Sequence, residues 1–174
     1  MYLLVILALP FIGSLLSSLM PANSRKLQAS LAGAVAVTCA LLTLYAYPDI
    51  ARGEVLESSR SWIPAHGLTF TLRMDGYAWL FSIIITAMGA LIALYAHYYL
   101  SAQDPVRRFF SFLQAFMGSM LGVVLSGNLI QLVVFWELTS LSSFMLIAYW
   151  YHRMDARTGA RMSLIIRGTG GFCL

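Results

Sequence analysis

Residues 129–151, LIQLVVFWELTSLSSFMLIAYWY, decide the fold, because the only charged side chain in this run of 23 residues is Glu137. An α-helix rises about 1.5 Å per residue and the hydrocarbon core of a bilayer is about 30 Å thick, so about 20 apolar residues are enough to cross it. The stretch therefore predicts a transmembrane helix. Comparable apolar runs precede it, and we expect an all-α, polytopic transmembrane helix bundle.

The composition supports this fold class. The chain is 60% hydrophobic and 10% charged, whereas soluble proteins are about 45–50% apolar and about 25% charged. The net charge of +4 does not indicate nucleic-acid binding, because the basic residues cluster in short loops, which is a membrane topology signal. Cys39 and Cys173 lie in apolar runs and are expected to be buried thiols. His and Cys show no metal-ligand spacing, so we expect no metal and no cofactor.

The ends of the apolar runs set the expected spans. The first twenty residues lack the basic segment of a signal peptide, so we interpret the first run as a retained helix. Pro48-Asp49 is expected to stop the second. The last run has only thirteen residues, too few to span, and we expect the chain to be the N-terminal part of a larger subunit with a single membrane domain over 1–174. The predicted spans are 2–20, 27–47, 76–100, 108–125, 129–151 and, incomplete, 162–174.

The longest polar segment, 49–75, predicts a small extracytoplasmic β-hairpin on the membrane surface. Apolar and polar residues alternate in its second half, which is the period of a strand. Trp62-Ile63 is the expected partner across a turn at residues 65–67. The alternating apolar residues are Leu68, Phe70, Leu72 and Met74.

Two further features follow from local patterns. Tyr95, Tyr98 and Tyr99 resemble an interfacial aromatic belt, so we interpret His97 as an interface residue rather than a proton relay. Gly118-x-x-x-Gly122 predicts close helix packing.

Charge asymmetry predicts the orientation. With alternating spans, the loops after the first, third and fifth helices carry seven basic residues, and the opposite loops carry three. The positive-inside rule places the first set in the cytoplasm, with the N-terminus and the hairpin outside. The first set is Arg25, Lys26, Arg107, Arg108, Arg153, Arg157 and Arg161, and the second is Arg52, Arg60 and Arg73.

Glu137 is the candidate functional residue. It lies nine residues after Asn128, or about 13–14 Å along a helix, and therefore near mid-membrane. Carboxylates in hydrocarbon are energetically costly and rare, and they usually face a bundle interior or a water path. We therefore hypothesise that Glu137 carries a proton. The alternative is a protonated carboxyl that only bonds a neighbouring helix. Residues 133, 134, 140 and 141 share its face, which is apolar apart from Ser140.

The residues around Glu137 allow two interpretations. The hydroxyls of Thr139, Ser140 and Ser143 either bond to carbonyls one turn earlier or hold water, or they are merely small side chains that allow helix contact. Trp136 is expected to be a packing anchor. Arg167, the only basic residue in an apolar run, either snorkels to the interface or pairs with Glu137.

The motif FWELTSLSSF at residues 135–144 resembles the fifth helix of the A subunit in Mrp-type multisubunit sodium/proton antiporters. Residues 73–76 (RMDG), 95–100 (YAHYYL) and 109–112 (FFSF) are similar to that family too. The resemblance covers essentially the whole chain. It implies that Glu137 is the glutamate of the proton path and that its partner is a lysine of a later helix, beyond Leu174. Arg167 departs from the pattern, which has a small or hydroxyl residue early in the sixth helix.

The resemblance implies the N-terminal bundle of a transporter subunit, not an enzyme, in a bacterial inner membrane. Its partners would be the lipid bilayer, other subunits of the complex, H+ and Na+ or another monovalent cation. Two alternatives stay open. One is a proton-pumping subunit of a complex I-like oxidoreductase or membrane-bound hydrogenase, and the other is a scaffold without transport activity.

Overall fold

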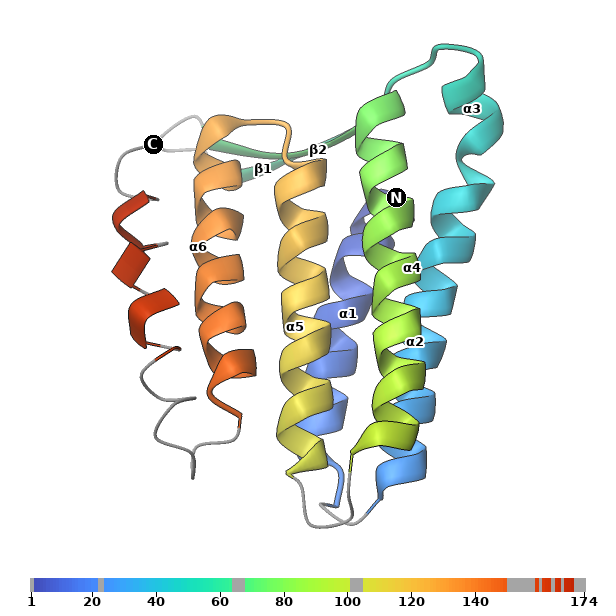
Figure 1. Ribbon diagram of the computed structural model, residues 1–174. Coiled ribbons are helices and arrows are strands. Elements are labelled where there is room, and N and C mark those ends of the chain that lie inside the picture. The colour runs from blue at the N-terminus through green and yellow to red at the C-terminus, as the bar shows by residue number, and fades with distance from the viewer. Residues whose placement is uncertain are drawn as a thin grey trace.

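The computed structural model describes residues 2–21, 24–63, 68–100 and 105–149, and residues 159, 161–163, 165, 166 and 168–170 of the last segment. Figure 1 shows the arrangement of the elements. In chain order these are α1 (Tyr2–Leu19), α2 (Arg25–Tyr45), α3 (Tyr47–Ala51), β1 (Leu56–Ile63), β2 (Leu68–Met74), α4 (Gly76–Tyr99), α5 (Val106–Leu125) and α6 (Leu129–Ile147).

Five long helices run up and down beside one another. α2 packs against α4 and α1 packs against α5, while α6 lies on the outer side of α5 (Figure 1). Within the described residues, five helices are long and apolar enough to cross a membrane, and they coincide with the five full spans that the sequence predicts. In the expected sixth span, 162–174, residues 162, 163, 165, 166 and 168–170 are helical, and the others lie outside the described residues.

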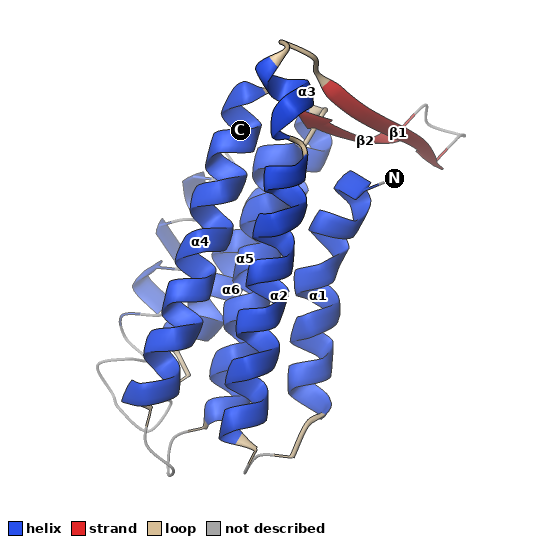
Figure 2. Ribbon diagram, turned by 90° about the vertical axis from the view of Figure 1, so that its right-hand side faces the viewer, coloured by secondary structure: helices blue, strands red, loops and turns tan. Residues whose placement is uncertain are grey.

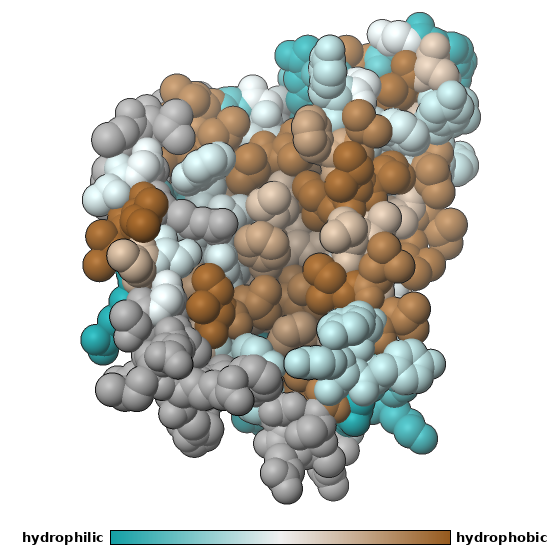
Figure 3. Space-filling view, in the orientation of Figure 1, coloured by the Kyte–Doolittle hydropathy of each residue, from teal (hydrophilic) through white to brown (hydrophobic). Residues whose placement is uncertain are grey.

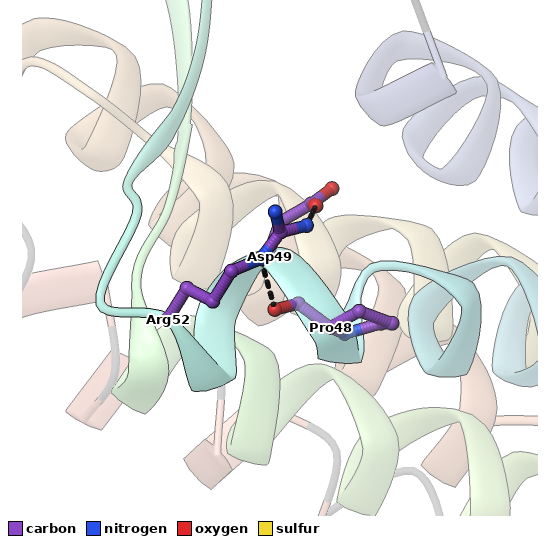
Figure 4. Close-up of polar contacts among 3 residues, drawn as sticks. All are labelled: Pro48, Asp49 and Arg52. Atoms are coloured by element: carbon purple, nitrogen blue, oxygen red, sulfur yellow. Dashed lines mark hydrogen bonds and ion pairs between the residues drawn. The ribbon is translucent and has the colours of Figure 1, made fainter.

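Helical structure does not stop at Pro48 as expected. The short helix α3 follows a turn at Ala46 and holds Pro48 in its first turn, where a missing N–H group costs nothing because that position has no intrahelical acceptor. Arg52 ends the helix. Its Nε donates to the carbonyl oxygen of Pro48 at 3.1 Å and its Nη2 pairs with Asp49 Oδ1 at 2.6 Å (Figure 4). The proline therefore redirects the chain towards the hairpin.

The predicted hairpin is present at the same end of the molecule as α3 (Figure 2). β1 and β2 pair antiparallel, with Leu56 opposite Met74 and Arg60 opposite Phe70. The first strand begins at Leu56, six residues before the expected Trp62. Residues 64–67, where we expect the turn, lie outside the described residues. Leu72 and Met74 are buried against the bundle, so the hairpin closes one end of it.

The hairpin is joined to the turn between α5 and α6. The N–H of Gly127 donates to the carbonyl of Thr71 at 2.8 Å, and Asn128 Nδ2 donates to the carbonyl of Thr69 at 2.7 Å. The N–H of Thr71 donates to Gln131 Oε1 at 3.1 Å. A Cβ at position 127 would lie 2.9 Å from the Thr71 oxygen, so only glycine fits this approach. These bonds fix where α6 begins.

Buried polar side chains join α1 to α5. The Ser111 hydroxyl donates to the carbonyl of Ser14 at 3.0 Å, and Gln114 Nε2 donates to Ser17 Oγ at 2.7 Å. All four side chains are buried. Such bonds hold membrane helices together where lipid supplies no hydrophobic driving force between them.

The basic residues divide between the two ends as the alternation of spans predicts. α1 ends, and α2 and α5 begin, at the end opposite the hairpin (Figure 1), which places Arg25, Lys26, Arg107 and Arg108 there. Arg52, Arg60 and Arg73 belong to the hairpin end. Arg153 and Arg157 lie outside the described residues. Cys39 is a buried free thiol as expected, and Cys173 lies outside the described residues.

Candidate functional site

Phe135 sets the rotation of α6 about its axis. A Cβ at Gly122 of α5 would lie 2.2 Å from the Phe135 ring, so the absence of a side chain there makes room for it. Phe11 of α1 and Phe70 of β2 have ring centroids 6.5 Å from that of Phe135. A Cβ at Gly118 would instead meet Phe11 at 3.0 Å. The Gly118–Gly122 motif therefore mediates close packing as predicted, but with two different neighbours.

The position of Phe135 turns Glu137 away from α5. Successive residues of a helix are about 100° apart, so Glu137, two residues later, lies about 200° round the axis from Phe135. On the side of Glu137, Val134 and Leu141 are 43% and 44% exposed. The buried residues of α6 lie on the other side and its flank, and they are Gln131, Phe135, Thr139, Ser140, Ser142 and Ser143.

The carboxyl group of Glu137 is half-buried and forms no ion pair with any residue that the structure describes. Its Oε1 is buried and accepts no hydrogen bond from any residue that the structure describes. The ion pairs among the described residues are Arg52–Asp49 and Arg73–Asp75, both at the hairpin end. Arg167, the alternative partner, lies outside the described residues, so its pairing with Glu137 stays a prediction. A carboxyl group without a partner is rare inside a membrane-spanning helix and usually faces a bundle interior or a water path.

Three hydroxyls after Glu137 bond back to carbonyl oxygens of the same helix. Thr139 Oγ1 and Ser140 Oγ donate to the carbonyl of Trp136 at 2.7 and 3.4 Å, and Ser142 Oγ donates to the carbonyl of Leu138 at 2.7 Å. Each hydroxyl oxygen keeps capacity to accept a hydrogen bond, for example from water.

The structure does not bring all the predicted site residues together. Thr139 and Ser143 lie about 200° and 240° from Glu137 on the helix, facing α5, whereas Ser140 lies within about 60° of it. Trp136 is 39% exposed. Instead of anchoring a core, it lines a groove of about 260 Å³ between α5 and α6. The groove residues are Phe116, Met120, Val123, Trp136, Thr139 and Ser140.

Sequence reasoning missed the residues that position α6. Asn128 caps the helix by accepting from the N–H of Gln131 at 2.8 Å, and Gln131 links it to the hairpin. An Asn directly before an apolar run is a helix-start signal that identifies the cap from sequence. The contact between Gly122 and Phe135 has no such signal, because it joins two helices. No group of three or more His, Cys, Asp or Glu that could hold a metal occurs among the described residues.

Two family sequence models match the chain. Residues 62–110 match the family described as NADH-ubiquinone oxidoreductase (complex I), chain 5 N-terminus. Residues 126–174, which contain Glu137, match the family described as NADH:quinone oxidoreductase/Mrp antiporter, TM.

Curated relatives resemble nearly the whole chain. The A/B subunit of a probable K(+)/H(+) antiporter of Rhizobium meliloti is 57% identical over 170 residues, 98% of this chain and 17% of that protein. The A subunit of a Na(+)/H(+) antiporter of Alkalihalophilus pseudofirmus is 48% identical over 70% of this chain and 15% of its own length. A putative antiporter subunit mnhA2 of Staphylococcus aureus is 40% identical over 87% of this chain and 20% of its own length. The chain thus spans at most a fifth of these relatives.

Solved structures share the fold. One chain of the Mrp complex from Dietzia sp. DQ12-45-1b superposes with a TM-score of 0.82 at 28% identity, covering 99% of this chain and 18% of that one. One chain of a membrane-bound sulfane sulfur reductase, an archaeal respiratory membrane complex, superposes with a TM-score of 0.83 at 20% identity. The match covers 97% of this chain and 34% of that one. The second likeness concerns the fold alone.

Proposed function

The chain belongs to the family formed by the A subunits of Mrp-type multisubunit antiporters, and we propose that it forms the first helices of a monovalent cation/proton antiporter subunit in which Glu137 carries the proton. The observation that carries the proposal is the buried, unpartnered Oε1 of Glu137 in the middle of a transmembrane helix. Ionisable side chains inside a membrane bundle mark proton and ion paths, which makes this carboxyl group the candidate carrier.

The direction of Glu137 indicates where its partner comes from. Among the described residues, no basic side chain lies on the outer face of α6. The packing of Phe135 against Gly122 turns the carboxyl group of Glu137 away from α1 and α5. The counter-cation is therefore supplied from outside the bundle of α1 to α5. The family resemblance implies a lysine of a later helix for this role. Ser140 is the one hydroxyl of the predicted set placed to assist, and Trp136 and Thr139 belong to the groove beside it.

The transported cation is the finer part of the proposal. The family resemblance implies Na+, while one relative is named for K+ and another for Na+. We keep Na+ as the first expectation and K+ as the alternative. Partner subunits, the bilayer and H+ complete the assembly. The site would lie in a bacterial inner membrane with the N-terminus outside, since Arg25, Lys26, Arg107 and Arg108 are at one end.

One observation favours a second candidate. Residues 62–110 match a family named for complex I, so a redox-driven proton-pumping subunit is the alternative function. The two differ in driving force: an antiporter acidifies or alkalinises a vesicle lumen when a cation gradient is applied, whereas a redox pump needs an electron donor. A scaffold without transport activity would do neither.

The test uses the complete complex in everted membrane vesicles, with exchange measured separately for Na+ and K+. Glu137→Gln keeps the shape and a hydrogen-bonding head but carries no titrating charge, so exchange should fall at least tenfold while the complex still assembles on native gels. Glu137→Asp should be intermediate. Glu57→Gln, on the exposed strand β1, is the matched control and should leave exchange unchanged.

Wild-type exchange in Glu137→Gln at normal assembly would remove the residue from the mechanism. A purely structural Glu137 predicts the reverse order, with Gln tolerated and Asp worse because of the cavity it leaves. Proton movement that follows an electron donor and ignores Na+ and K+ gradients would favour the redox pump.

A further inference from the structure

A groove of about 580 Å³ lies between α2 and α4, away from α6. Many of the residues that line this groove are small, namely Ala, Ser and Gly. Figure 3 shows the surface over α2 and α4 as mostly hydrophobic, with a hydrophilic region at the end opposite the hairpin. The small residues of the groove are Ala29, Ser30, Gly33, Ala34, Ala90 and Ala93.

The groove extends over one leaflet of a membrane. On α2 it runs from Lys26 to Val37, eleven residues or about 16 Å, which is about half of a hydrocarbon core of about 30 Å. On α4 it runs from Ala90 to His97. This length matches the acyl chain of a lipid in one leaflet, whereas a transmembrane helix of a partner subunit would extend beyond the groove.

The polar end of the groove is positively charged. Lys26 and His97 line it, and Lys26 forms no ion pair with any residue that the structure describes. The neighbouring Arg25 is engaged, since its Nη2 donates to the carbonyl of His97. Nδ1 of His97 is buried and has no hydrogen-bond partner among the described residues. An anion at this end would meet the ammonium group of Lys26, which has no ion-pair partner among the described residues.

We propose that this groove is a binding site for an anionic phospholipid, with one acyl chain along the small residues of α2 and α4 and the phosphate beside Lys26 and His97. Length, apolar lining and charge all fit one lipid of the leaflet at the basic end. An uncharged headgroup would fill the same groove but would lack the attraction to Lys26, worth about 1 kcal/mol per basic side chain near an anionic surface. The site is independent of the role of Glu137.

The test is photo-crosslinking in the complete complex, reconstituted in vesicles of equimolar phosphatidylglycerol and phosphatidylcholine. A benzophenone amino acid is placed at Ser30, which lines the groove, and at Thr38, exposed on the same helix outside it. Mass spectrometry then counts lipid adducts. We expect about a fivefold excess of phosphatidylglycerol at Ser30, the ratio equivalent to about 1 kcal/mol, and a ratio of about one at Thr38.

Four variants separate the effect of charge from the effect of space. Lys26→Gln should bring the Ser30 ratio to about that of Thr38, and Lys26→Arg should preserve it, while Arg60→Gln at the other end should have no effect. Gly33→Leu should reduce all lipid adducts at Ser30, because no atom lies within 4 Å of a Cβ at position 33 and the added side chain occupies the groove without displacing α2.

Three outcomes would overturn the proposal. Equal lipid ratios at Ser30 and Thr38 would show bulk lipid only. An unchanged ratio in an assembled Lys26→Gln complex would exclude the headgroup contact. A protein adduct at Ser30 would identify the groove as a subunit interface instead.

Discussion

Replacing Gly122 by alanine should displace α6 and with it Glu137. The new Cβ would lie 2.2 Å from the ring of Phe135, whereas non-bonded carbon atoms prefer about 3.5–4.0 Å. The ring, or the helix that carries it, must therefore retreat by roughly 1.3–1.8 Å. The ring has little room to do so, since Phe11 and Phe70 flank it.

The expected cost follows from overpacking, which typically destabilises a protein by about 1–3 kcal/mol. The same movement shifts the carboxyl of Glu137, two residues away. Misplacement of a reacting group by about 1 Å can lower a rate by on the order of 10²-fold. We therefore expect Gly122→Ala to lower both the thermal stability of the complex and its cation/proton exchange.

The assay compares the apparent unfolding temperature of the purified complex with exchange in everted vesicles. Gly33→Ala is the matched control, because it also replaces a mid-helix glycine but meets no atom within 4 Å. Its stability should stay the same or rise by up to about 1 kcal/mol. Adding Phe135→Leu to Gly122→Ala should recover part of the loss, with a coupling of about 0.5–3 kcal/mol in a double-mutant cycle.

Equal stability of Gly122→Ala and Gly33→Ala would refute the reasoning, as would additive effects of Gly122→Ala and Phe135→Leu. Either result would mean that the glycine does not seat the ring, and the rotation of α6 would then need another cause.

Two further predictions concern topology and the start of α6. Cysteines at Lys26 and Glu57 should react with impermeant reagent from opposite sides of the membrane, Glu57 from outside, and labelling from one side would disprove the topology. Asn128→Ala removes the helix cap and the bond to the hairpin, so it should destabilise the complex by about 0.5–2 kcal/mol. Asn128→Asp keeps the oxygen that accepts from the N–H of Gln131 but loses the donor to the Thr69 carbonyl. It should therefore restore only the part of the loss that belongs to the cap, measured as the apparent unfolding temperature, and equal losses in the two variants would argue against the cap.

The spans could be predicted from sequence because hydropathy depends on each residue and not on its neighbours in space. Two boundaries were harder. Pro48 was expected to end a helix, yet a proline is equally at home in the first turn of the next one. The start of β1 at Leu56 could not be predicted, because Glu57, Ser59 and Arg60 are polar and exposed and give no alternation of apolar and polar residues. β2 shows that alternation because it buries Leu72 and Met74.

The depth of Glu137 in the membrane could be predicted from the sequence, but the side of α6 on which it lies could not. The position of Glu137 along α6 follows from counting residues from Asn128, and its rarity follows from charge. The direction depends on which face of α6 meets α5. Polar residues such as Gln131, Thr139 and Ser143 lie on the buried side, but the sequence leaves open whether such hydroxyl residues face a neighbouring helix or a water path. Only the contact of Phe135 with Gly122 decides it, and with it the separation of Thr139 from the carboxyl.

The polar contacts between α1 and α5 also concern the order of synthesis. Ser14 and Ser111 are 97 residues apart, and at about 5–20 residues per second the first helix waits roughly 5–20 s for its partner to be made. During this interval Ser14 and Ser17 cannot bond to α5, and α2 is the helix already made that packs most extensively against α1. During this time an insertase or chaperone could bind the side of α1 that carries Ser14 and Ser17. Packing of α5 against α1 would then displace it.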